Sequence, residues 1–419
     1  MRFKIQAQEL NEALGVVGIV TPRPVTPMGP AGFLFVVREG RCYIYSRDAQ
    51  HQARVDVAVE EVEGEGSFIY PADKIAALKY LDGVIDFEAG HEVESDRYWV
   101  RYHASGATEE RSTINPGLMQ TIDEALENTK EETVYPSALL REGISMTKAF
   151  LASANDGRAR DNFKSLQLFD DSNEEWKKGD GTLFAADGVR ACFFFCEAFQ
   201  GKGLGIHGQH LPLLTSFLGK CEGDVTIKHG EGVTYAINSV GQVLGWAHHV
   251  HQHEKFSYYP YKKDKFVLKA PKELLVKALK FVRAGLDPKK DKIRITYSHE
   301  GKTVQFLTSE GAAGKASSMP VGVQPIADDG KGGGESSETA DFAANANVNQ
   351  LLELFEPLRG FEADLRVAVI PPKQGRKEAH LFRTVEEFWL DGNGKVIISP
   401  EDSEKAYECR ITRFMPSRE

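Results

Sequence analysis

The chain has 419 residues, 41% of them hydrophobic and 27% charged, which is the composition of a globular protein of about two to four domains. Its formal net charge of −10 argues against an open basic face for DNA. It does not exclude a protein whose positive charge is confined to one surface while the rest is acidic. No apolar stretch is long enough to cross a membrane, and the N-terminus lacks the apolar core of a signal peptide. Because the five cysteines also form no CxxC pair, we expect a reduced, cytoplasmic protein that does not contact membranes.

Three segments begin in the same way, with a short strand that leads into an amphipathic helix. In the third segment, residues 274 to 282 place their apolar side chains on one helical stripe, whereas Lys277, Lys280 and Arg283 lie off it. The chain therefore repeats itself. The three openings are RFKIQAQELNEALGVVGIV from Arg2, TVYPSALLREGISMTKAFL from Thr133 and KFVLKAPKELLVKALKFVR from Lys265.

In each repeat, strands follow the opening helix, and a second half-repeat of the same kind follows those strands. In the first and third repeats, the strands predict hairpins that turn at a Glu-Gly pair, at Gly40 and Gly301. Each second half reads as a strand or loop, a helix, a turn and a strand. These second halves occupy residues 68–88, 205–228 and 342–369.

Six half-repeats of this kind predict an α+β protein of three similar domains, each with helices packed on antiparallel sheet. We place the domains at residues 1–130, 131–264 and 265–419, with boundaries near an acidic stretch and near YYPYKKDK. The Gly/Ser/acidic segment at 327–341 reads as a surface loop inside the third domain.

Four short motifs, set in six half-repeats, resemble the bacterial-type DNA sliding clamp, the β subunit of the replicative polymerase. They are TPRPVTPMG (21–29), YPADK (70–74), FAADGVRA (184–191) and RFMP (413–416). They resemble, in that order, the family's Arg-Pro segment after the first helix, its Val-Pro-x-x-Lys helix start, its Ala-Thr-Asp-Gly-His-Arg-Leu segment and its terminal Met-Pro. Val189 stands in place of the usual His and Ala191 in place of the usual Leu, and residues 370–410 enlarge the third domain. These departures fit a divergent member of the clamp family, of bacterial or viral origin.

The resemblance implies a head-to-tail homodimer that closes a ring around duplex DNA, with helices lining the hole. Such a clamp is not an enzyme and needs no cofactor or metal; it binds a replicative DNA polymerase and a clamp loader through short peptide motifs. Basic helix faces inside and an acidic exterior would also account for the net charge. Two-fold rather than three-fold closure follows from the resemblance alone.

The same resemblance implies two sets of site residues. Arg23 matches a DNA-contacting Arg of the family, and the other DNA candidates follow from their positions on helices: Lys74, Lys79, Arg141, Lys148, Lys277, Lys280 and Arg283. An ordinary solvated helix charge is the competing interpretation for each of them. The peptide-binding cleft would be formed by Phe163, Ala186, Gly188, Val189, Arg190, Ala191, Met415 and Pro416. In that cleft Asp187 would hold the bend and would not be catalytic.

Two other interpretations compete with the clamp. Alternation places His249, His251 and His253 on one strand face, as a zinc ligand set of a metal-dependent hydrolase would be, although no Cys or carboxylate is clustered with them. A clamp-like docking hub that does not encircle DNA is the second. Within the clamp interpretation, QLLELF (350–355) resembles the peptide motif carried by clamp partners, but it sits where the sixth half-repeat needs a core helix. The alternative, that it occupies the cleft of its own chain, would require that helix to unfold.

Overall fold

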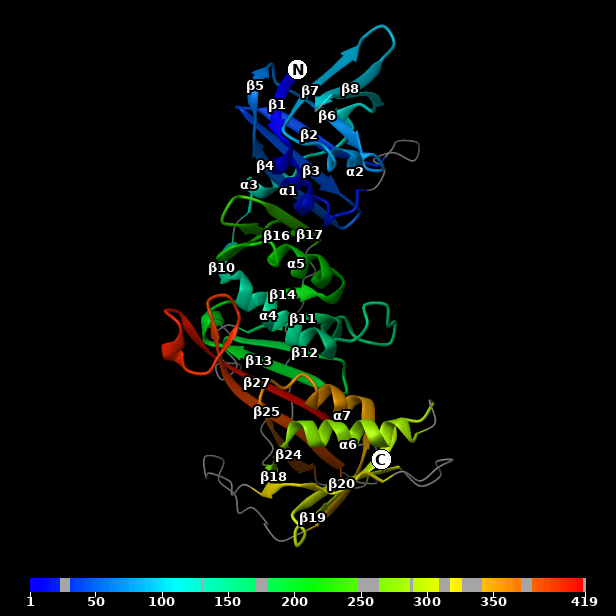
Figure 1. The fold of residues 1–419 in the computed structure, drawn as a ribbon, viewed down its shortest axis with the longest axis vertical. Helices are drawn as coiled ribbons and strands as arrows, with labels where there is room; N and C mark the ends of the chain where they lie inside the picture. Colours follow the sequence, from blue (N-terminus) through cyan, green and yellow to red (C-terminus); the bar gives the residue numbers. More distant parts are fainter. Residues whose placement is uncertain are drawn as a thin grey trace. The chain divides into compact units, whose positions relative to one another are not determined.

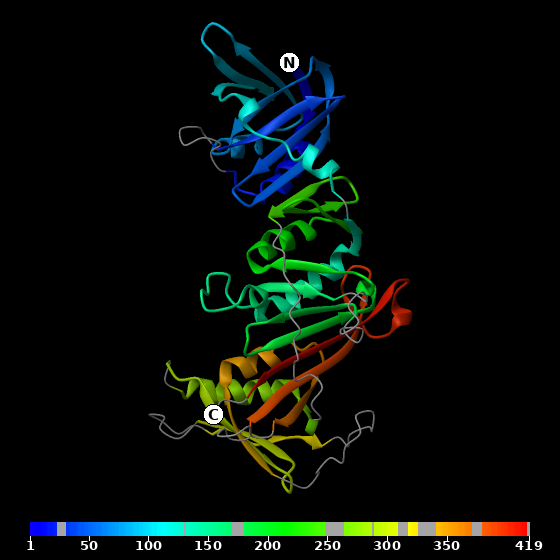
Figure 2. The ribbon, with the colours of Figure 1, turned by 180° about the vertical axis from the view of Figure 1, so that it is seen from behind.

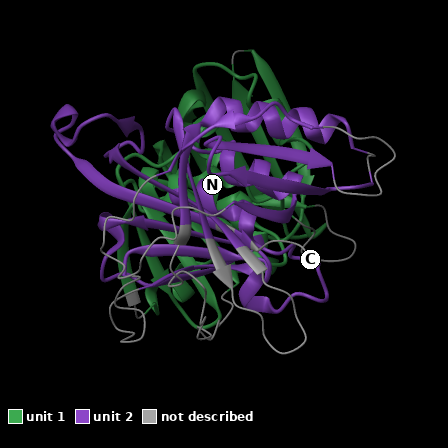
Figure 3. Ribbon diagram, turned by 90° about the horizontal axis from the view of Figure 1, so that it is seen from below, with its two compact units in different colours: residues 1–142, 209–250 green, residues 143–208, 251–419 purple. Residues whose placement is uncertain are grey.

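The computed structural model describes residues 1–22, 31–104, 106–129, 131–169, 180–247, 264–286, 289–308, 317–325, 341–370 and 379–416. Within these residues, no helix is both long enough and apolar enough to span a bilayer. The chain forms two compact units, coloured separately in Figure 3. Unit 1 comprises residues 1–142 and 209–250, and unit 2 comprises residues 143–208 and 251–419.

Each of the six predicted half-repeats contains a strand that leads into a helix (Figure 1). The amphipathic patterns explain why: in the longest helix, Leu275, Ala278, Leu279 and Val282 are all buried on one stripe. The strand–helix pairs are β1 (Arg2–Gln6) with α1 (Ala7–Val17), β6 (Gly66–Pro71) with α2 (Ile75–Leu78), β10 (Glu131–Pro136) with α4 (Ser137–Thr147), β14 (Leu204–His207) with α5 (Leu211–Leu218), β18 (Asp264–Pro271) with α6 (Lys272–Ala284), and β23 (Phe342–Asn347) with α7 (Val348–Phe355). QLLELF is thus part of a core helix, as expected.

Unit 1 contains two antiparallel sheets. The first has the strand order β5-β1-β7-β8-β9 and the second β10-β15-β16-β17-β4-β3-β2-β6. The hairpin predicted at Gly40 is the β2–β3 pair, in which Arg38 lies opposite Arg41. The strands not yet bounded are β2 (Gly32–Arg38), β3 (Arg41–Arg47), β4 (His51–Ala58), β5 (Glu60–Glu63), β7 (Val84–Glu92), β8 (Arg97–Ala104), β9 (Ala107–Thr113), β15 (Asp224–His229), β16 (Val233–Asn238) and β17 (Val243–Ala247); a short helix, α3 (Asp123–Glu127), precedes β10.

Unit 2 contains a ten-stranded sheet of order β14-β11-β12-β13-β27-β25-β24-β18-β22, with β26 paired to β25, and a four-stranded sheet β21-β20-β19-β23. The hairpin predicted at Gly301 is the β19–β20 pair. Helices α6 and α7 lie side by side in both views of the ribbon (Figures 1 and 2). The remaining strands are β11 (Ser165–Leu168), β12 (Thr182–Ala186), β13 (Ala191–Cys196), β19 (Lys292–Ser298), β20 (Thr303–Thr308), β21 (Val321–Gly322), β22 (Gln324–Pro325), β24 (Glu362–Ile370), β25 (Ala379–Asp391), β26 (Val396–Ile397) and β27 (Ala406–Pro416).

Both large sheets continue across the domain boundaries that the sequence suggests. In unit 1, β17 pairs with β4, so that Trp246 lies opposite His51. In unit 2, β13 pairs with β27, with Cys196 opposite Cys409. The α+β class and the antiparallel pairing of repeated elements are as predicted, whereas the division at residues 130 and 264 remains a prediction.

Candidate peptide-binding site and nucleic-acid interface

The bend between β12 and β13 is built around the carboxylate of Asp187. Its Oδ1 accepts hydrogen bonds from the backbone N–H groups of Val189 (2.8 Å) and Arg190 (2.6 Å), and its own N–H donates to the carbonyl of Arg190 (3.2 Å). Gly188 has a φ of +89°, which a side chain would strain. Asp187 therefore holds the bend, as expected from the sequence.

Arg190 is fixed by several neighbours within unit 2. Its Nε donates to Oδ2 of Asp187 at 2.7 Å, its guanidinium lies 5.6 Å from the ring centroid of Phe150, and it forms an ion pair with Glu353 of α7. Only 14% of the side chain is exposed. Because two carboxylates and a ring constrain it, Arg190 is a rigid part of this surface.

An apolar cluster adjoins the bend. Ala186 and Ala191 face each other across β12 and β13 and are buried with Phe184 and Leu381. The ring of Phe163 packs against this cluster and lies 3.4 Å from where a Cβ on Gly188 would be. The structure thus brings five of the predicted cleft residues together: Phe163, Ala186, Gly188, Arg190 and Ala191.

Val189 and Met415 occupy contrasting environments. Val189 is 52% exposed at the tip of the bend, where a partner could cover it. Met415 is fully buried and lies opposite Phe382, whereas its neighbour Phe414 lies opposite Ala191. Because side chains alternate along a strand, Met415 faces away from the side of the sheet that carries Ala191. The backbone of Pro416 lies opposite Leu381; its side chain is outside the described residues.

Two of the three predicted cationic residues of α6 contact α7 or the residue that follows it. Lys277 is exposed and has no ion pair with any described residue. The Nζ of Lys280 lies 2.8 Å from a carboxylate oxygen of Glu356, and the Nε of Arg283 donates to Asn349 at 2.8 Å. The helix also carries Lys272 and a single acid, Glu273, so positive charge dominates it.

The other predicted DNA-contact residues are scattered over both units. Lys74 is ion-paired with Asp73 at 2.9 Å, Arg141 is exposed on α4, and Lys148 is exposed directly after α4. Arg23 lies outside the described residues. By contrast, α1 contains Glu9 and Glu12 and no basic residue, and the sequence analysis named no DNA-contact candidate on it.

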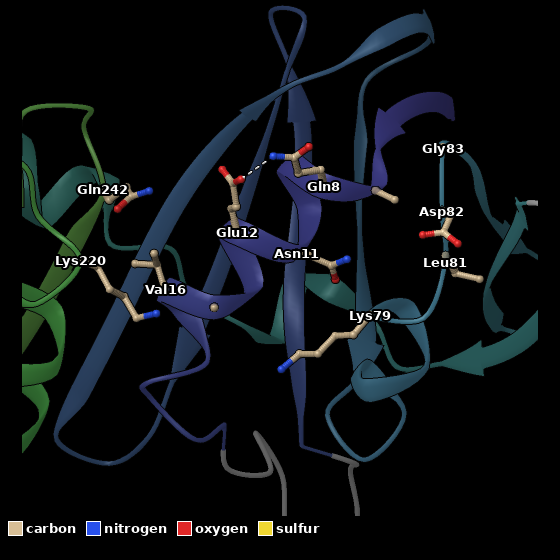
Figure 4. Close-up of a pocket in the computed structure, with 12 residues that line it drawn as sticks. Gln8, Asn11, Glu12, Val16, Lys79, Leu81, Asp82, Gly83, Lys220 and Gln242 are labelled. Atoms are coloured by element: carbon tan, nitrogen blue, oxygen red, sulfur yellow. Dashed lines mark hydrogen bonds between the residues drawn. The ribbon is translucent and has the colours of Figure 1, made fainter.

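Lys79 lines a cavity of about 810 Å³ in unit 1, next to α1. Lys220, which follows α5, lines the same cavity, and the two side chains extend toward α1 from opposite sides (Figure 4). The Nζ of Lys220 lies 3.6 Å from where a Cβ on Gly15 would be. Neither lysine has an ion pair with another residue in the part of unit 1 that the structure describes.

Sequence reasoning missed Lys220, although the repeats carried a signal for it. Lys79 and Lys220 both follow the helix of a second half-repeat and precede the glycine of the turn that follows, Gly83 and Gly223 respectively. Aligning the half-repeats residue by residue would have placed these lysines at nearly equivalent positions.

The histidines of the alternative metal interpretation, His249, His251 and His253, lie outside the described residues. Among the residues that are described, no group of three or more His, Cys, Asp or Glu side chains is arranged to hold a metal ion.

Fold comparison places the chain with the bacterial DNA sliding clamps: it has their fold over its whole length. The DNA polymerase III subunit beta of Pseudomonas aeruginosa matches with a TM-score of 0.73 at 16% identity, covering 100% of both chains. The C. crescentus beta sliding clamp matches with a TM-score of 0.71 at 15% identity and 100% of both chains, and the Bacillus subtilis clamp with 0.71 at 13%, covering 100% of this chain and 99% of its own. No protein-family model and no curated sequence matches. The expected resemblance in fold is confirmed.

Proposed function

We propose that this protein is a DNA sliding clamp, which closes a ring around duplex DNA and tethers a replicative DNA polymerase. The observation that carries the proposal is the match of fold over the full length of both chains, at a TM-score of 0.73. A partial match would fit any protein that shares one repeat. A match over all six half-repeats fits a protein whose function, like that of a clamp, requires all of them.

The distribution of charge supports sequence-independent contact with DNA. A chain with a net charge of −10 carries Lys277, Lys280 and Arg283 together on α6, and beside α1 it carries Lys79 and Lys220, which form no ion pair with any described residue. Lysine and arginine bind phosphates without reading bases, which is the contact that sliding needs.

The bend at Asp187 supports docking of linear peptides. It combines an exposed apolar residue, Val189, with a fixed guanidinium and an adjoining apolar cluster. Peptide sites commonly pair apolar pockets with a few fixed polar groups. The partners would be the polymerase and a clamp loader, each through a short apolar motif.

Exposed apolar residues at the start of α6 support contact with a second copy of the chain. Leu274 is 49% exposed and Phe361 is 91% exposed, and the carbonyl of Phe361 accepts a hydrogen bond from the N–H of Lys272 at 2.9 Å. A large apolar surface at one helix start is costly in an isolated chain. Burying it in a head-to-tail homodimer would remove that cost.

Size-exclusion chromatography with in-line light scattering and small-angle X-ray scattering tests the assembly. We expect twice the 46.4 kDa of one chain and the scattering profile of a hollow ring. A compact monomer at every concentration would rule out encirclement and favour a docking hub. As a variant, Leu274→Asp should shift the mass toward one chain, whereas Val240→Asp, at an exposed turn, should not.

A further inference from the structure

Cys196 and Cys409 lie directly opposite each other in unit 2, on the neighbouring antiparallel strands β13 and β27 (Figure 1). Cys196 is the last residue of β13, and Cys409 lies near the start of β27. Both are free thiols, and both are 0% exposed. Two thiols that are far apart in the sequence are thus adjacent in the sheet.

The backbone hydrogen bonds show that the two cysteines form a non-hydrogen-bonded pair of the antiparallel ladder. In such a ladder the N–H and C=O of one residue point to the same neighbouring strand, and those of the next residue point to the other strand. The N–H of Cys196 donates to the carbonyl of Gly181, which precedes β12, at 3.0 Å. The N–H of Glu408 donates to Glu197, which follows β13, at 2.9 Å, so the N–H of Cys409 points away from β13. Each cysteine directs its backbone groups away from the other, and the Cα atoms of such a pair lie about 4.5 Å apart.

This arrangement meets the geometric requirement of a disulfide. Side chains of directly opposed residues project from the same face of a sheet, and they are closest in a non-hydrogen-bonded pair. Disulfides join Cα atoms about 4.4–6.8 Å apart, a range that includes the spacing of such a pair. The thiols also interact with each other, because a hydrogen bond with the Cys196 thiol, together with burial, raises the pKa of Cys409. Cys192, on the same strand as Cys196, lies opposite Arg413 and has no thiol across from it.

We propose that Cys196 and Cys409 are a reversible disulfide site that reacts with hydrogen peroxide. One thiolate attacks an oxygen of the peroxide, the O–O bond breaks, and the sulfur becomes a sulfenic acid as water is released. The second thiol then attacks this sulfur, the S–S bond forms, and a second water leaves. In total the two thiols lose two electrons and two protons, and the peroxide is reduced to water.

The position of the pair determines when it reacts. The thiolate is the reactive form, so burial and the raised pKa protect Cys409 while the sheet is closed. The adjoining residues Glu197 and Glu408 are exposed, because the pair lies where β13 ends and β27 begins. Strand ends open more easily than the core, so we expect oxidation to be slow and to accelerate on warming. Once formed, the bond would fasten β27 to β13 and restrict the unfolded chain.

Peptide mapping of the full chain tests the site. The protein would be treated with hydrogen peroxide just below its unfolding midpoint, its remaining thiols alkylated in denaturant, and the chain digested with trypsin. We expect a disulfide between peptides 191–202 and 406–410 in the wild type and in Cys192→Ala, but not in Cys196→Ala. Cys192→Ala is the matched control because both cysteines lie in the first peptide. Absence of the linked peptides in the wild type, or their persistence in Cys196→Ala, would overturn the proposal.

Thermal unfolding tests whether the bond fastens the two strands. The oxidised wild type should unfold at least about 4 °C above the reduced protein, and dithiothreitol should reverse the rise. Reversal separates the disulfide from methionine oxidation, which dithiothreitol leaves in place. Cys409→Ala, treated in the same way, should show no reversible rise. Equal midpoints for oxidised and reduced wild type would contradict a disulfide that fastens β27 to β13.

Discussion

Val189 is the side chain at the Asp187 bend that a partner could reach most directly, because about half of it is exposed. We expect Val189→Asp to weaken binding of a labelled Gln-Leu-Leu-Glu-Leu-Phe peptide, a copy of residues 350–355, by at least about tenfold, since a charge would replace apolar contact. Fluorescence anisotropy of the labelled peptide measures its affinity for the protein. Val240→Asp, at another exposed valine, is the control. Unchanged peptide affinity in Val189→Asp would remove the bend from the peptide site.

The resemblance to the clamp family predicted the bend at Asp187, and the residues agree with it, because Asp-Gly favours a tight turn and the side chain of Asp can bond nearby backbone N–H groups. It did not allow the environment of Met415 to be predicted. Which face of a strand a residue takes depends on its register with neighbours, here Phe382 and Ala191, which lie far away in sequence. A charge at Met415 would destabilise the sheet and would not test the cleft.

At the scale of elements, the ion pair of Arg190 and Glu353 links the bend to α7. Because Glu353 is 46% exposed, water weakens the pair, and a double-mutant cycle with Arg190→Met and Glu353→Gln should give a coupling of about 0.5–1 kcal/mol. Urea unfolding of the two single variants and the double variant provides the values. Additive effects would show that the pair contributes nothing to stability.

Helix α6 carries the largest group of predicted DNA contacts. Reversing Lys277, Lys280 and Arg283 to Glu should weaken DNA binding and reduce the slope of log affinity against log salt by about one for each phosphate that the protein no longer neutralises. Binding to a duplex across a salt series measures this slope. Reversing Lys302, Lys395 and Lys405, which lie on hairpins, should change it less. An unchanged slope in the α6 variant would exclude α6 from the DNA face.

Helix openings and two hairpins could be predicted because their signals are local: apolar residues at helical spacing, and Glu-Gly at a turn. The pairing of β4 with β17 and of β13 with β27 could not, since it joins segments that lie far apart in the sequence. The acidic residues of α1 were not part of the prediction, which named only basic residues on the helices.

For the whole molecule, internal repetition predicted the fold because six similar half-repeats need each other's surfaces to bury their apolar faces. Large sheets that run through suggested domain boundaries are a consequence of that need. A ring adds a property that no single phosphate contact provides: weak contacts allow movement, while closure prevents escape.

Retention on end-blocked DNA tests closure most directly. The protein would be threaded at high concentration over the free end of a linear duplex whose other end is blocked, and the free end would then be capped with streptavidin. We expect the protein to remain through a wash at about 1 M salt, which removes electrostatically bound protein, and to leave when a restriction enzyme cuts the DNA. Equal loss from capped and uncapped duplex in that wash would contradict a clamp that encircles DNA.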